Sequence, residues 1–140
     1  VRTSTPFGIH NKKKSFPLWV KENLELKKEI KVLTDQFTSP TYVPNLSKML
    51  IELSLREITG IINLAGLTRI SRFQLAELVA DMLNLDKKLL ISTKTDEMDW
   101  KAQRPKDSSL DVSFATEILN EKPQKIEQSL ELFLSKLKNN

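Results

Sequence analysis

Asp35 and Gln36 form the first group of residues in this sequence whose types and placement could bind a ligand. They follow the apolar run at residues 30–33 and belong to the stretch TDQFTSPTY at residues 34–42. Loops on a rigid frame are where α/β proteins hold their ligand-binding groups, and an Asp beside a Gln offers both donors and acceptors. The alternative is a loop whose Asp and Thr side chains satisfy only their own backbone.

Arg104 is a second candidate, within the mostly polar stretch AQRPKDSSLD at residues 102–111. A planar guanidinium suits a phosphate group, because it can donate two parallel hydrogen bonds to it. The alternative is that Arg104 pairs with Asp107 or Asp111 and only holds the loop in place. The stability and the ligand affinity of one variant would distinguish these two interpretations.

Several kinds of chemistry are missing from the sequence. It has no cysteine, which excludes thiolate sites and disulfides. Its single histidine, His10, lies in an expected loop beside Gly8 and Asn11, where a histidine is more often a surface residue than a member of a nucleophilic triad. Its three glycines are too widely spaced to form a phosphate-binding loop. The only tyrosine, Tyr42, is followed four residues later by Leu46 instead of a lysine. We therefore expect no catalytic residue and no metal site within these 140 residues.

The composition is that of an ordinary globular chain with one core. Of its 140 residues, 39% are hydrophobic and 29% are charged, and Lys plus Arg outnumber Asp plus Glu by 22 to 18. The short lysine clusters have no interleaved aromatic residues, which favours a solvated surface over a nucleic-acid face, although some could attract a diphosphate. No apolar run approaches the roughly 20 residues that cross a bilayer. We expect neither a nucleic-acid nor a membrane partner.

The apolar periodicity predicts an α/β fold with short, mainly parallel strands and amphipathic helices. Strands are expected at residues 1–4, 30–33, 61–65 and 89–91. Helices are expected at residues 16–28, 45–59, 71–83, 113–119 and 123–137. Asn45 and Ser113 should cap their helices, and Ser71 with Gln74 has the form of a capping box. Residues 92–112 are expected to form a long ordered loop.

Three segments resemble, in order, the motifs of one family. Residues 2–8 resemble the R-T-S-x-x-x-G stretch of extended short-chain dehydrogenase/reductases, residues 31–42 their D-Q-x-x-S-P-T-Y loop, and residues 102–111 their A-x-R-P-x-x-S-x-L-D segment. The combination is characteristic of dTDP-4-dehydrorhamnose reductases and of the regulatory subunit of methionine adenosyltransferase, which shares the fold. The resemblance spans essentially the whole chain.

This resemblance implies a C-terminal part of an extended short-chain dehydrogenase fold of the Rossmann type. Residues 1–140 would be a single substrate-binding portion, and the N-terminal NAD(P)-binding half with its Tyr/Lys pair would be missing. The parent enzyme would reduce the 4-keto group of a nucleotide-linked deoxysugar, in dTDP-L-rhamnose biosynthesis, with NADPH or NADH. The alternative is a non-catalytic regulatory subunit of the methionine adenosyltransferase type. We also expect a cytoplasmic setting, which the lack of cysteine allows, and a homodimer is compatible with the resemblance.

The resemblance also implies roles for particular residues. Those that would face the nucleotide-sugar are Ser15, Phe16, Asp35, Gln36 and Arg104. Those that would run beside the nicotinamide of the cofactor are Arg2, Thr3 and Ser4. The family commonly has Trp-x-Tyr after its Arg-Thr-Ser, whereas residues 5–7 here read TPF, so that Phe7 would replace part of an aromatic wall for the sugar.

Overall fold

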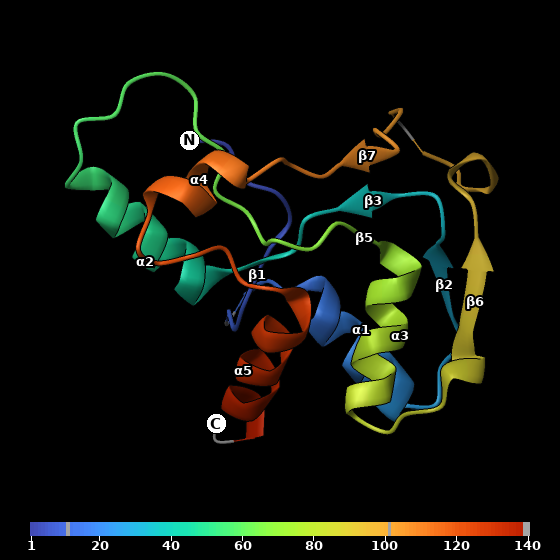
Figure 1. The fold of residues 1–140 in the computed structure, drawn as a ribbon. Helices are drawn as coiled ribbons and strands as arrows, with labels where there is room; N and C mark the ends of the chain where they lie inside the picture. The colour runs from blue at the N-terminus through green and yellow to red at the C-terminus, as the bar shows by residue number, and fades with distance from the viewer. Residues whose placement is uncertain (11, 101, 139–140) are drawn as a thin grey trace. The chain divides into compact units, whose positions relative to one another are not determined.

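The computed structural model describes residues 1–10, 12–100 and 102–138 (Figure 1). The chain divides into two compact units. The first unit comprises Val1–Ile9, Ser39–Arg69 and Ser109–Asn140. The second unit comprises His10–Thr38 and Ile70–Ser108. The chain therefore passes between the two units several times, and each unit contains motif segments that are far apart in the sequence.

The second unit is built on two packed helices and a parallel pair of strands. Helix α1 (Phe16–Glu25) packs beside α3 (Arg72–Met82), and β2 (Ile30–Leu33) pairs in parallel with β6 (Leu90–Thr93) (Figure 1). The apolar residues at helical spacing supply the buried faces: Val20, Leu24, Leu75, Ala76 and Val79 are all fully buried. Two short 3-10 helices flank β6, η1 (Lys87–Leu89) and η2 (Thr95–Glu97).

A three-stranded sheet completes the second unit. The central strand β3 (Phe37–Thr38) lies between β5 (Ile70–Ser71) and β7 (Asp107–Ser108) (Figure 1). It runs antiparallel to β5 and parallel to β7. As a result, the end of β5 and the starts of β3 and β7 lie at the same edge of this sheet.

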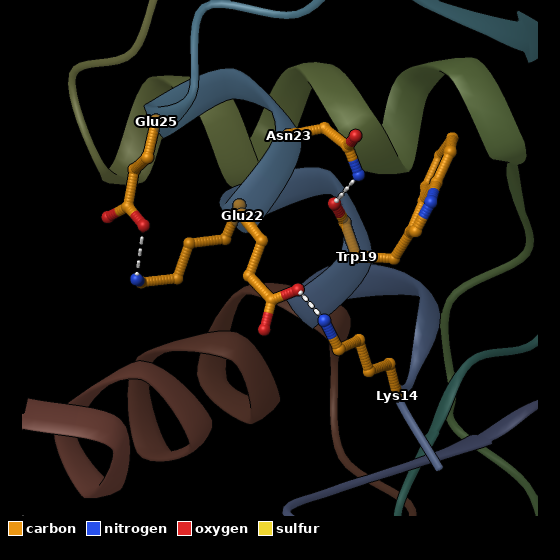
Figure 2. A network of polar contacts seen from close by, with 6 residues as sticks. Lys14, Trp19, Glu22, Asn23 and Glu25 are labelled. Atoms are coloured by element: carbon orange, nitrogen blue, oxygen red, sulfur yellow. Dashed lines mark hydrogen bonds and ion pairs between the residues drawn. The ribbon is translucent and has the colours of Figure 1, made fainter.

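The exposed side of α1 has paired charges. Lys14 Nζ lies 2.6 Å from Glu22 Oε2, and the Asn23 amide donates to the Trp19 carbonyl oxygen at 2.8 Å (Figure 2). The Trp19 ring extends away from these contacts (Figure 2). Exposed ion pairs of this kind contribute little to stability.

The first unit contains a short parallel pair and three helices. Strand β1 (Pro6–Phe7) pairs with β4 (Thr41–Tyr42), and the helices are α2 (Val43–Ser54), α4 (Ser113–Ile118) and α5 (Ile126–Lys138). One part of its core consists of Met49, Ile62, Leu64, Ala115 and Leu119. In another part, the Phe7 ring lies 5.5 Å from the Tyr42 ring and 5.6 Å from the Phe133 ring.

Two sequence predictions about capping were wrong. Asn45 lies inside α2, because the helix begins at Val43 with Pro44 in its first turn, where a missing N–H costs nothing. Its buried amide instead donates to Glu121 Oε1 at 2.7 Å and to the Lys122 carbonyl at 3.1 Å. Ser113 is the first residue of α4, and its backbone N–H donates to the Asp111 carboxylate at 2.9 Å.

Other boundaries also differ from the predictions. The strands expected at residues 1–4 and 61–65 are reduced to one parallel bridge between Arg2 and Asn63. The helices expected to reach residues 28 and 59 end at Glu25 and Ser54, and the last helix begins at Ile126 instead of residue 123. The expected loop 92–112 contains the end of β6, η2 and β7. The predicted strand at residues 30–33 and the capping box of α3 are confirmed.

Candidate functional site

One edge of the three-stranded sheet in the second unit brings together three polar residues. Gln36 precedes β3, Lys106 precedes β7 and Arg72 follows β5, so all three lie at the edge where these strand ends meet. Backbone hydrogen bonds hold the arrangement: Arg72 N–H donates to the Gln36 carbonyl at 3.0 Å, and Phe37 N–H donates to the Lys106 carbonyl at 2.7 Å. Short strands thus position side chains that are up to 70 residues apart in the chain (36 and 106).

The Arg72 guanidinium is held on two sides. Its Nε donates to Gln36 Oε1 at 3.4 Å, and its central carbon lies 5.0 Å from the centre of the Phe16 ring. The Phe16 ring is in turn 5.8 Å from the Trp19 ring. Partial burial lowers the pKa of Arg72 below its ordinary value, and the positive charge of Arg104 lowers it further. Arg72 therefore contacts both Phe16 and Gln36, two residues that were expected to face the substrate.

Arg104 is exposed and stacks on an aromatic ring. Its guanidinium carbon lies 4.2 Å from the centre of the Trp100 ring, a cation–π contact. In the part of the chain that the structure describes, Arg104 forms no ion pair with Asp107. The stacking leaves the edge nitrogens of the guanidinium available for an anion.

Asp35 is already bound by its own unit. Its Oδ1 accepts hydrogen bonds from the backbone N–H and from the hydroxyl of Thr95, both at 2.9 Å, and its Oδ2 is 3.8 Å from Lys106 Nζ. Burial by itself would raise the pKa of Asp35, but the hydrogen bonds from Thr95 and the charge of Lys106 outweigh it and lower the pKa. The Asp35 carboxylate, just after β2, therefore binds Thr95, the first residue of η2.

Two polar groups of the second unit are buried without a partner. The hydroxyl of Ser15, the residue before α1, and the indole Nε1 of Trp100 have no hydrogen-bond partner among the described residues. Each unpaired buried polar group costs free energy, of the order of 1–3 kcal/mol. Ser15 was expected beside the substrate, and the structure places it directly before Phe16, where its hydroxyl does not cap the helix.

The residues expected beside the cofactor lie in the first unit. The backbone N–H of Arg2 donates to the Ile62 carbonyl, and the Arg2 carbonyl accepts from Leu64 N–H, both at 2.8 Å. The side chains of Arg2 and Thr3 are exposed. Ser4 is 5% exposed, and its hydroxyl accepts from the backbone N–H of Ser39 at 3.3 Å. Ser4 thus joins two motif segments of the first unit.

The Ser-Pro-Thr segment is the centre of this network. The Thr41 hydroxyl donates to the Ser4 carbonyl at 2.6 Å and accepts from Gly66 N–H at 3.0 Å. The Ser39 hydroxyl accepts from Leu110 N–H at 3.2 Å. A Cβ at Gly66 would lie 2.0 Å from the Pro40 carbonyl oxygen, so only glycine fits there. These motif residues hold the fold of the first unit together.

An open hollow in the first unit contains none of the residues expected at the site. It is lined by Leu67, Leu110, Asp111, Val112, Ser113, Thr116 and Glu117. Among the described residues, no group of three or more His, Cys, Asp or Glu side chains could hold a metal ion. None of the helices in the described ranges is long and apolar enough to cross a membrane.

The fold and the motif arrangement define a class: the C-terminal part of a Rossmann-type, extended short-chain dehydrogenase/reductase. Residues 1–139 match the family described as the RmlD substrate binding domain, and the chain belongs to that family. This finding and the relatives below support the reductase interpretation and not the regulatory-subunit alternative.

Two solved structures that share this fold carry the name of a dTDP-4-dehydrorhamnose reductase. The dTDP-4-dehydrorhamnose reductase of Bacillus anthracis, in complex with NADP, is 25% identical with a TM-score of 0.86 over 96% of this chain and 47% of its own. A hypothetical dTDP-4-dehydrorhamnose reductase from Sulfolobus tokodaii is 36% identical with a TM-score of 0.75 over 89% of this chain and 43% of its own.

A curated relative points in the same direction. A probable low-salt glycan biosynthesis reductase, Agl14 of Haloferax volcanii, is 28% identical over 98 residues, which cover 70% of this chain and 33% of that protein. The chain therefore spans less than half the length of each of these three relatives.

Sequence reasoning missed Arg72. Its signal was present, because it is a cation at the first position of a helix with no acidic residue in its first turn. Helix N-termini favour acidic side chains, and a cation there is electrostatically unfavourable. An arginine in that position is a reason to look for an anion nearby.

Proposed function

We propose that this chain is the nucleotide-sugar-binding portion of an NAD(P)H-dependent reductase of the dTDP-4-dehydrorhamnose reductase type. The reaction would reduce the 4-keto group of a dTDP-linked deoxysugar to a hydroxyl. The match of residues 1–139 to the RmlD substrate binding domain carries this proposal. The relatives named as dTDP-4-dehydrorhamnose reductases support it.

In this proposal the whole protein is longer than the present chain. A preceding portion would hold most of the cofactor and the groups that move the proton, since residues 1–140 have no glycine-rich phosphate loop and no Tyr–Lys pair one helical turn apart. The setting would be the cytoplasm, which fractionation of cells would test.

We assign the sugar-nucleotide contacts to the second unit. Gln36 and Phe16 would face the substrate, and Arg104 would bind a phosphate group with the nitrogens that its stacking on Trp100 leaves available. The unpaired hydroxyl of Ser15 offers a further donor or acceptor. Asp35 would act indirectly, because its bonds to Thr95 position the loop that follows β6.

Only a few residues of this chain, at residues 2–4, would lie near the cofactor. NADPH or NADH, when bound, supplies the hydride. The exposed side chains of Arg2 and Thr3 could donate hydrogen bonds to it, whereas the Ser4 hydroxyl is already used by Ser39. The backbone bonds between Arg2 and residues 62 and 64 fix the direction in which the Arg2 and Thr3 side chains leave the backbone.

The test uses the full-length protein and the oxidation of NADPH and NADH with a dTDP-linked 4-keto sugar. We expect turnover that needs the sugar nucleotide. Arg104→Gln should raise KM for the sugar nucleotide about 10- to 100-fold while the affinity for NADPH stays unchanged, because a charge-assisted bond contributes about 1.5–3 kcal/mol. Arg104→Lys should restore part of the affinity.

Two results would contradict the proposal. An absence of turnover with dTDP-, UDP- and GDP-linked keto sugars would remove the reductase assignment. A lower melting temperature of Arg104→Gln with unchanged KM would show that Arg104 only holds its loop, and would remove it from the site.

A further inference from the structure

The second unit holds two arginines with no acidic partner among the described residues. Three carboxylates of this unit pair with lysines instead: Lys106 lies 3.8 Å from Asp35 and 4.0 Å from Asp96, and Asp81 pairs with Lys87 at 2.8 Å. Arg72 and Arg104 form no ion pair in the same ranges. Lys106, which lies at the same sheet edge as Arg72, is in contrast close to two carboxylates.

The position of Arg72 is electrostatically unfavourable for the protein alone. It is half-buried, it is the first residue of the 11-residue helix α3, and Arg104 is close enough to depress its pKa. Burial, the positive end of a helix and a like charge all disfavour a cation. Such an arrangement is stable in a folded protein when an anion offsets it, and charge clusters of this kind gather at functional sites.

Contacts within the protein already fix the orientation of the Arg72 guanidinium before any ligand binds. Its Nε is occupied by Gln36 Oε1, and one face of the group lies over Phe16, so its two terminal nitrogens have no partner in the described residues. Arg104 is likewise held by one face, on Trp100. Aromatic support reduces the conformational freedom that each guanidinium would lose when it binds a ligand, and in Arg72 the hydrogen bond at Nε reduces it further.

We propose that Arg72 is a second phosphate ligand, and that Arg72 and Arg104 together bind the diphosphate of a nucleoside diphosphate or its sugar ester. Two neighbouring guanidinium forks match two linked phosphates, whereas one carboxylate or one phosphate would engage a single fork. This inference rests on the proposed function. It adds Arg72, whose guanidinium is oriented by Gln36 and Phe16, to the residues that bind the diphosphate.

The test is calorimetric titration of the full-length protein with thymidine diphosphate, thymidine monophosphate and NADPH. Arg72→Gln should weaken thymidine diphosphate binding about 10- to 100-fold, weaken the monophosphate less, and leave NADPH unchanged. Arg72→Lys should give an intermediate affinity for the diphosphate. The matched control is Lys106→Gln, which removes a positive charge from the same sheet edge and should change the affinity less than about threefold.

Unchanged affinity of Arg72→Gln for thymidine diphosphate would overturn the inference while the proposed function stands. Equal losses in Arg72→Gln and Lys106→Gln would also overturn it, because they would show general attraction by charge. If Arg72→Gln does not fold, Arg72→Lys decides, and wild-type affinity of that variant is the overturning result. Failure of the wild-type protein to bind any nucleoside diphosphate would remove the proposed function and this inference together.

Discussion

The two units of this chain use their polar side chains in opposite ways. In the first unit, the hydroxyls of Ser4, Ser39 and Thr41 bind backbone groups within the unit. In the second unit, Arg72 and Arg104 are supported on aromatic rings and have no acidic partner among the described residues. The Ser-Pro-Thr segment thus holds the fold of the first unit, whereas the two guanidinium groups of the second unit are not neutralised by a carboxylate of the described residues.

The largest effect that would test this comparison is expected at Gly66. Gly66→Ala should lower the free energy of unfolding by about 3 kcal/mol or prevent folding, because the added Cβ would meet the Pro40 carbonyl oxygen at 2.0 Å. Chemical denaturation of the full-length protein measures the change. The control is Gly8→Ala, whose Cβ would meet Val43 at an ordinary 3.4 Å and should change stability by less than about 1 kcal/mol.

Thr41→Val should have the next largest effect. It keeps the shape of the side chain but leaves the Ser4 carbonyl and the Gly66 N–H without the Thr41 hydroxyl, at a cost of about 1–3 kcal/mol. Ser47→Ala is the control, because that exposed hydroxyl only bonds within its own helix and should matter by less than about 0.5 kcal/mol. Equal melting temperatures for both variants would show that the buried network does not stabilise the first unit.

A pH-dependent effect is expected from Glu52, which accepts hydrogen bonds from Asn120 N–H at 2.7 Å and Glu121 N–H at 2.8 Å and also pairs with Arg56. These bonds lower the pKa of Glu52 from 4.5 to about 2. A lowered pKa means that the stabilisation is complete above pH 4.5 and is lost as the pH falls towards 2.

The stability of wild type and Glu52→Gln should therefore differ at neutral pH and converge between pH 4.5 and 2. Thermal melts at several pH values measure the difference. Glu57→Gln, an exposed carboxylate of the same unit, is the control and should follow the wild type at every pH. A constant gap between wild type and Glu52→Gln down to pH 2 would contradict the assignment.

Arg72→Met is expected to have the smallest effect on stability. The variant loses the contact with Phe16 and a long hydrogen bond to Gln36, but it relieves the repulsion from Arg104 and from the helix N-terminus. These terms are each about 0.3–1 kcal/mol and oppose one another, so the free energy of unfolding should change by less than about 1 kcal/mol. A loss above about 2 kcal/mol would place Arg72 with the structural residues of the first unit.

The sequence by itself determined the elements that local chemistry controls. Apolar residues at helical spacing identified α1 and α3, the apolar run at residues 30–33 identified β2, and Ser71 with Gln74 identified the start of α3, because the capping box is complete within four residues. The three motif segments likewise identified the family, since they are read directly from residue order.

Only the tertiary structure decided which polar groups are used and which remain available. Asp35 is bound by Thr95, 60 residues later, and Asn45 by Glu121, 76 residues later. Arg72 reaches Gln36, 36 residues earlier, because β5 pairs with β3. Such pairings depend on strand register and on packing between distant segments, and periodicity within a short window contains no information about either. For this reason Asn45 was misassigned as a cap and Arg72 was missed, although both residues were visible in the sequence.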